Sequence, residues 1–130
     1  MTTKIKAIKI DAENRDVYEV ELDGTLENYY KEIGCRLIEK ISIVNKHDLI
    51  IDEEATFKFE RLDELRIIHG FQLLGIDNPI IGNALIVSYD NKGNWRSHKL
   101  HVKQVKACVM FGAWFANKPE KQVDEVNKIA

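Results

Sequence analysis

Alternating and continuous apolar stretches divide the chain into short elements, most of them typical of β-strands. Residues 83–90 are apolar at consecutive positions from Ala84 to Val87, which indicates a central strand that is buried on both faces. The turn residues 91–94 follow, and residues 95–102 are expected to return as the partner strand. We therefore expect the sheet to be organised around residues 83–90.

The N-terminal pattern predicts a β-hairpin. Residues 17–22 alternate strictly between apolar and acidic positions, as in a half-buried antiparallel strand. In residues 4–10 the apolar positions change face near Ala7, which either a β-bulge or burial of both faces would explain. The polar residues 11–15 supply the turn between the two strands.

A capped amphipathic helix is predicted over residues 25–34. Its apolar positions recur at i, i+3, i+4 and i+7 and form one stripe. Thr25 is a good N-cap, and Gly34 suits the left-handed position after the last turn. Strands over residues 36–44 and 49–51 are expected next, joined by a polar turn.

The remaining segments carry weaker patterns. Residues 56–59 alternate like a strand, and residues 61–75 fit either a pair of strands or an irregular excursion. A helix is predicted over residues 102–116 from the spacing of the apolar positions, although valines and Gly112 oppose it. Residues 120–130 form a short amphipathic helical tail that either docks or frays.

These elements predict a single α+β domain over residues 1–130. We expect a twisted, mostly antiparallel sheet, with the helix of residues 25–34 on one face and the helix of residues 102–116 packed beside it. A chain of 130 residues removes roughly two thirds of its unfolded surface from water, which suffices for one core.

Composition indicates a globular protein of a reducing compartment. Hydrophobic residues make up 45 % and charged residues 31 % of the chain. No apolar run approaches the roughly 20 residues of a membrane span, and the first residues lack the apolar region of an export signal. Cys35 and Cys108 make no disulfide framework, so the cytoplasm is the expected location.

The net charge of −2 hides an uneven distribution. Residues 1–90 carry 18 acidic and 11 basic side chains, whereas residues 91–119 carry six basic side chains and no acidic one. Cations attract phosphates or acidic surfaces, and an indole ring offers a stacking face. Alternatively, Trp95 fills the core and the lysines keep an outer strand soluble. The candidate ligand-binding residues are Lys92, Trp95, Arg96, His98, Lys99, His101, Lys103 and Lys106.

Other chemistry is sparse. No serine lies in a nucleophile elbow, and no glycine-rich phosphate loop is present, so we predict no catalytic residue and no cofactor. Asp52, Glu53 and Glu54 form an acidic turn that could hold a hard cation, although such turns are usually plain surface. The adjacent aromatic residues Trp114 and Phe115 are candidates for a subunit interface.

Several short motifs resemble those of a known family. Residues 24–34, 48–54, 77–82 and 84–87 carry the similarity, which extends over roughly residues 4–90. The chain resembles the uncharacterised domain-of-unknown-function family numbered 3846, small proteins found largely in phages, plasmids and conjugative elements. The resemblance implies a compact α+β fold and an origin in a mobile element, and it implies no catalytic residue.

We therefore expect a non-enzymatic binding module of mobile-element origin that recognises an anionic partner. A nucleotide signal, a nucleic acid or an acidic host protein would suit, and interference with a host defence system is the role that this origin suggests. One alternative is a small metal-dependent enzyme acting on a nucleotide or nucleic acid. Another is an oligomerisation or scaffold protein. No membrane partner is expected. Assembly of the chain into a homo-oligomer is a further prediction.

Overall fold

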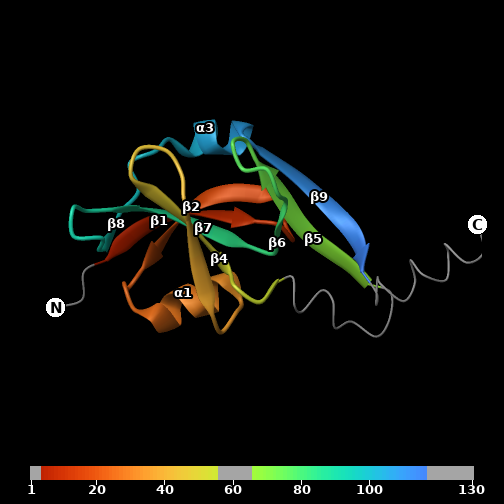
Figure 1. The fold of residues 1–130 in the computed structure, drawn as a ribbon, viewed down its shortest axis with the longest axis horizontal. Coiled ribbons are helices and arrows are strands. Elements are labelled where there is room, and N and C mark those ends of the chain that lie inside the picture. The colour runs from red at the N-terminus through yellow and green to blue at the C-terminus, as the bar shows by residue number, and fades with distance from the viewer. Residues whose placement is uncertain (1–3, 56–65, 117–130) are drawn as a thin grey trace, which may run out of the picture.

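The computed structural model describes residues 4–55 and 66–116, and within these residues strands predominate (Figure 1). The elements are β1 (Ile5–Asp11), β2 (Asp16–Leu22), α1 (Leu26–Ile33), β3 (Ile38–Ser42), β4 (His47–Asp52), β5 (Arg66–Leu73), β6 (Ile80–Ile81), β7 (Ala84–Tyr89), β8 (Trp95–Arg96), α3 (Val102–Ala107) and β9 (Val109–Ala116). The α+β class is confirmed. None of the helices in the described residues is both long and apolar enough to cross a membrane.

The strands pair antiparallel and form two sheets instead of the single sheet that we expected. The larger sheet, here called sheet A, has the order β2-β1-β7-β4-β3, and β8 pairs with β7 beside this row. The smaller sheet, sheet B, has the order β6-β5-β9. In Figure 1, sheet B and α3 lie on one side of sheet A, and α1 lies on the other.

The prediction that residues 83–90 form the central strand is confirmed. β7 lies between β1 and β4, and its residues Ala84 to Val87 are at most 1 % exposed. Leu85 and Val87 pack in the cluster that contains α1, whereas Ala84 and Ile86 pack in the cluster on the opposite face. Burial on both faces explains why this strand is apolar without alternation.

The N-terminal hairpin is also confirmed, and burial of both faces explains its irregular pattern. β1 and β2 pair in continuous register from Ile5–Leu22 to Asp11–Asp16, with no bulge. Ala7 packs on the α1 face of sheet A and Ile8 on the other, and both are fully buried.

The predicted caps hold α1 in place. The Thr25 hydroxyl accepts a hydrogen bond from the Asn28 backbone N–H at 3.2 Å, and Gly34 adopts a φ of 84°. Tyr29 and Ile33, one turn apart, bury their side chains against sheet A. The helix therefore begins and ends where its sequence predicts.

The second helix does not lie beside α1. Val105 of α3 packs with Phe71 and Leu73 of β5 on the other face of sheet A. The expectation that both helices share one face is wrong, because sheet B and α3 together form a separate cover. The core consequently has two clusters, one on each face of sheet A.

Two predictions for the C-terminal third need correction. The predicted helix of residues 102–116 is right for Val102–Ala107 only, because Val109–Ala116 pairs with β5 along its full length. Valine and glycine are weak helix formers, so the complete ladder of backbone hydrogen bonds with β5 favours a strand over these residues. The predicted strand 95–102 pairs with β7 only at Trp95–Arg96.

The ambiguous segment of residues 61–75 contains one strand in its described part, β5. The predicted strand of residues 56–59 and the predicted tail of residues 120–130 lie outside the described residues.

Candidate functional site

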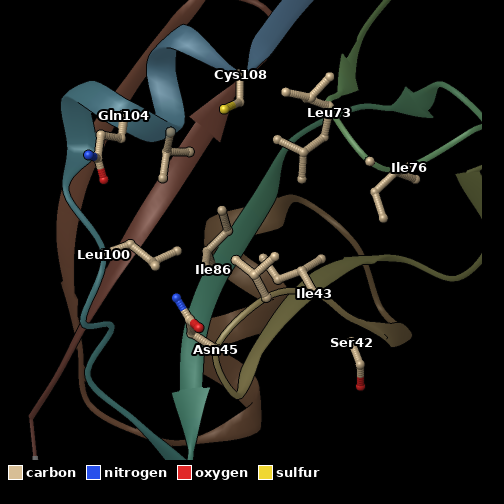
Figure 2. Close-up of a pocket in the computed structure, with 13 residues that line it drawn as sticks. Ser42, Ile43, Asn45, Leu73, Ile76, Ile86, Leu100, Gln104 and Cys108 are labelled. Carbon is tan, nitrogen blue, oxygen red and sulfur yellow. The ribbon is translucent and has the colours of Figure 1, made fainter.

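An apolar cleft of about 600 Å³ opens on the α3 side of sheet A (Figure 2). Three segments that are distant in sequence form its walls: the turn between β3 and β4, the loop after β5, and α3 with the residues around it. Ile86 of β7 forms part of its floor. A volume of this size lies within the range of small-molecule sites.

A tight hairpin turn forms the first wall. Asn45 and Lys46 adopt φ values of 53° and 58°, and the His47 backbone N–H donates to the Val44 carbonyl oxygen at 3.1 Å. Two consecutive residues with positive φ are typical of a type I′ turn. The turn holds Val44 at the rim of the cleft, where its side chain is 65 % exposed.

The loop after β5 forms the second wall. The Leu74 backbone N–H donates to the Cys108 carbonyl oxygen at 2.9 Å, which ties this loop to the end of α3. Gly75 has a φ of 92°, a conformation that glycine adopts without steric cost. Leu74 is 79 % exposed at the rim, whereas Leu73 is buried.

The third wall comes from the α3 region. Gln104 lies on α3, Leu100 precedes the helix and Cys108 is its C-cap residue, and all three line the cleft. Val105 is buried between α3 and the core and closes the base of this wall. This region therefore presents one apolar, one amide and one thiol side chain to the cleft.

The lining of the cleft is mostly aliphatic. Among the described residues that line it there is no Asp, Glu, Lys, Arg or His. The amides of Asn45 and Gln104 have no hydrogen-bond partner among the described residues, and in the view of Figure 2 Leu100 lies between them. The Ser42 hydroxyl points away from the cavity. The arrangement can bind an apolar group and offer a few amide hydrogen bonds.

A strap, here residues 95–101, begins with β8 and leads into α3, and two buried polar residues of β4 anchor it to sheet A. His47 and Asp48 are each 1 % exposed. The strap continues into Leu100, which lines the cleft. These two anchors therefore position one wall of the site.

His47 anchors the strap on the cleft side. Its Nδ1 lies 2.8 Å from the Asn45 carbonyl oxygen, and its Nε2 lies 2.9 Å from the Lys99 backbone nitrogen. Because the Lys99 N–H can only donate, Nε2 must accept and Nδ1 must carry the proton. The imidazole is therefore neutral in this arrangement and has a fixed tautomer.

Asp48 anchors the strap on the α1 side. Its Oδ2 accepts a hydrogen bond from the Trp95 indole at 3.0 Å, and its Oδ1 accepts one from the Ser42 hydroxyl at 3.3 Å. The Trp95 ring also lies 4.8 Å from that of Tyr29. The contacts of Trp95 match the alternative in which it fills the core.

Three of the candidate ligand-binding residues are paired with acidic side chains. Arg96 contacts Asp90 at 3.0 Å, His98 contacts Glu19 at 2.6 Å, and Lys106 contacts Asp16 at 2.9 Å. The hydrogen bond from Lys106 lowers the pKa of Asp16, and that from the Asn94 backbone N–H lowers the pKa of Asp90. These contacts reduce the positive charge that the segment presents to an external anion.

The other cationic candidates are exposed and have no ion pair within residues 4–55 and 66–116. Lys92 lies in the turn between β7 and β8, Lys99 in the strap, and Lys103 on α3. His101 is the exposed N-cap residue of α3. The predicted binding residues thus extend over several elements and include none of the residues that line the cleft.

The acidic turn does not converge on one point. Both carboxylate oxygens of Glu54 accept hydrogen bonds from Arg36, at 2.7 and 2.9 Å, and Asp52 accepts one from the Glu54 backbone N–H. The Glu54 carboxylate raises the pKa of Arg36. Across the described part of the chain, no group of three or more His, Cys, Asp or Glu residues is placed to hold a metal ion. Glu53 belongs to no such group.

Trp114 and Phe115, the predicted interface residues, lie on β9 and not on a helix. They pair with Ile68 and Ile67 of β5. Whether they contact a partner subunit stays a prediction.

Sequence reasoning missed the cleft and the role of His47. The available signal was the presence of an aliphatic residue next to a turn residue: Val44 precedes Asn45, and Leu74 precedes Gly75. No local pattern indicates that the two turns approach the same helix. The cleft could be recognised only after the tertiary contacts were known.

Comparisons with known proteins give a family and no function. A family model described as "Domain of unknown function (DUF3846)" matches residues 5–109. The match extends beyond the similarity seen in residues 4–90 and includes α3 and the start of β9. Neither a search of curated proteins nor a search of solved structures finds a match.

Proposed function

Because the chain belongs to the DUF3846 family, whose description names no activity, we propose a function from its own site: a small non-enzymatic module that binds an uncharged, largely aliphatic ligand in the cleft. The main support for this proposal is the cleft of about 600 Å³, which is lined mostly by aliphatic side chains and has exposed Val44 and Leu74 at its rim. Nothing in this proposal requires a reaction.

Burial of apolar surface supplies the binding energy. Each Å² of apolar surface removed from water contributes about 25 cal/mol, so a ligand that covers the lining residues gains affinity without any charge. The absence of charged side chains among the described lining residues disfavours a ligand whose charge would be buried. The Asn45 and Gln104 amides would orient a hydroxyl or carbonyl group at the margin.

A blocking substitution tests this proposal. We expect N-phenyl-1-naphthylamine, a neutral fluorescent probe of apolar sites, to bind the native chain and to lose most of its binding in Gln104→Trp, because the indole fills the cleft. Lys103→Trp is the matched control on the same helix, since Lys103 does not line the cleft. Equal probe binding in both variants would contradict the assignment.

The thiol of Cys108 provides a second readout. In a Cys35→Ser background, only Cys108 can react with a thiol reagent, and a ligand in the cleft should slow this reaction. Native mass spectrometry of protein taken directly from cells should then show the mass of the natural ligand. Unchanged thiol reactivity in the presence of bound probe would place that probe elsewhere.

An anionic partner remains the second candidate. It is favoured by Lys92, Lys99 and Lys103, which are exposed and have no ion pair among the described residues. A nucleotide, a nucleic acid or an acidic protein would suit these cations, whereas Arg96, His98 and Lys106 would first have to leave their acidic neighbours. The mobile-element origin and the role against host defence stay predictions from the family resemblance.

Salt dependence separates the two candidates. If the lysines bind phosphates, affinity for labelled single-stranded DNA should fall with salt, and the double variant Lys99→Glu/Lys103→Glu should reduce the logarithmic salt slope by about 1.4. The control Lys4→Glu/Lys31→Glu makes the same change in net charge at two other exposed positions. Lys4 directly precedes β1, and Lys31 lies on α1. Identical slopes in both double variants would exclude this lysine set.

A further inference from the structure

The edge strands of the two sheets are protected to different extents. In sheet A, the edge strand β2 carries Asp16, Glu19 and Glu21, and the edge strand β3 carries Glu39 and Lys40. β6 and β8 have two residues each. Charged side chains and short length are the usual means by which edge strands avoid pairing with other chains.

β9 has neither protection. It is eight residues long and contains no charged residue and no proline. It pairs with β5 from Val109–Leu73 to Ala116–Arg66, and no other strand of the described residues pairs with its second edge. In Figure 1, β9 is the outermost strand of sheet B. Among the described residues, the backbone groups on that edge therefore have no strand partner and can accept one.

We propose that this edge of β9 pairs antiparallel with β9 of a second copy of the chain. A strand paired with itself about a two-fold axis is self-complementary, because each donor meets the equivalent acceptor of the partner. The pairing brings no like charges together, since Val109–Ala116 is uncharged. The same contact through β2 would bring acidic residues together.

The exposed side chains of β9 agree with this partner. Met110 is 73 % exposed, and Gln72, the β5 residue with which it pairs, is exposed as well. A second β9 alongside would cover part of the Met110 side chain. The two three-stranded sheets would then form one continuous sheet with the order β6-β5-β9-β9-β5-β6. This inference does not depend on ligand binding in the cleft.

Sedimentation velocity and amide hydrogen exchange test the dimer. The chain of 15.0 kDa should sediment as a dimer at high concentration and dissociate on dilution. Met110→Lys should raise the dimer dissociation constant at least about tenfold, because it places two lysines at the new strand pair. Gln72→Lys is the matched control: it adds the same charge to the neighbouring strand, away from the edge, and should leave the dimer intact.

Hydrogen exchange distinguishes edge pairing from association through a face of the sheet. In the native chain, the β9 amides that do not bond to β5 should be protected at high concentration and exchange rapidly at low concentration. This measurement does not depend on the outcome for Met110→Lys or Gln72→Lys. A native chain that is monomeric at all concentrations would overturn the proposal. So would a dimer in which these alternate amides exchange as fast as in the monomer.

Discussion

The two faces of sheet A share the same strands and differ in how completely they are covered. On one face, α1 inserts Tyr29 and Ile33 over Leu85 and Val87, and these side chains are at most 6 % exposed. On the other, α3 contributes a single buried side chain, Val105, and Ile86 lines the floor of the cleft. The difference lies in the covers: one is an eight-residue helix that buries an aromatic ring, and the other combines sheet B with a six-residue helix that buries one valine.

The largest effect should come from truncating β7 on the two faces. We expect Leu85→Ala to lower the free energy of unfolding by about 3–5 kcal/mol, because it opens a cavity in a closed core. Ile86→Ala should cost less, about 2–3 kcal/mol, since one side of Ile86 already borders the cleft. Chemical denaturation measures both, and a larger loss in Ile86→Ala would contradict the contrast between the faces.

Alkaline pH should destabilise the α1 face. Burial raises the pKa of Tyr29 from 10.0 to about 12, so the phenol ionises in the unfolded chain before it does so in the folded one. The free energy of unfolding should therefore be unaffected below pH 10 and fall by about 2–3 kcal/mol between pH 10 and pH 12. Burial and the Asp11 hydrogen bond also raise the pKa of Tyr18 to about 12, which adds to the fall.

Tyr29→Phe should remove only the contribution of Tyr29. The Tyr29 hydroxyl is buried and has no hydrogen-bond partner among the described residues, so its removal should not reduce stability at neutral pH. Denaturation of both proteins below pH 10 and near pH 12 provides the measurement. An equally steep alkaline fall in Tyr29→Phe would assign the effect to other groups.

Releasing the strap from either anchor should have a smaller effect that differs between the faces. We expect His47→Phe and Trp95→Phe each to cost about 1–3 kcal/mol, because the first leaves the Lys99 N–H at a partly buried site and the second the buried Asp48 carboxylate without its partner. Only His47→Phe should also weaken probe binding, since it frees the backbone next to Leu100. Probe titrations that change equally in both variants would argue against His47 as the support of the cleft wall.

The smallest effect is expected at the ion pair between α3 and β2. Lys106→Met removes the contact with Asp16 at a site where both side chains are about half exposed. Exposed ion pairs contribute little, so the melting temperature should not change measurably. The variant is therefore a control for substitutions on α3, and a clear loss of stability would show that α3 depends on its outer contacts.

Local patterns were sufficient to predict the elements of the α1 face. The caps Thr25 and Gly34 set the ends of the helix, and the continuous apolar run of β7 indicates a strand covered on both sides. These signals depend on neighbouring residues, so the sequence contains them in full.

The cleft face depends on contacts between distant segments, which the sequence does not display. Residues 109–116 are apolar throughout and fit a buried helix or a buried strand equally well, and their pairing with β5 decides the outcome. The basic residues are evident in the sequence, yet the contacts of Arg96, His98 and Lys106 with acidic residues come only from the fold.

The position of β7 also has a consequence for biosynthesis. The strand in the middle of sheet A comes from Ala84–Tyr89, whereas its two neighbours come from Ile5–Asp11 and His47–Asp52. During translation, both hairpins emerge from the ribosome before the strand that joins them. The nascent chain must therefore wait, with the inner edges of β1 and β4 unpaired, until residue 89 has emerged.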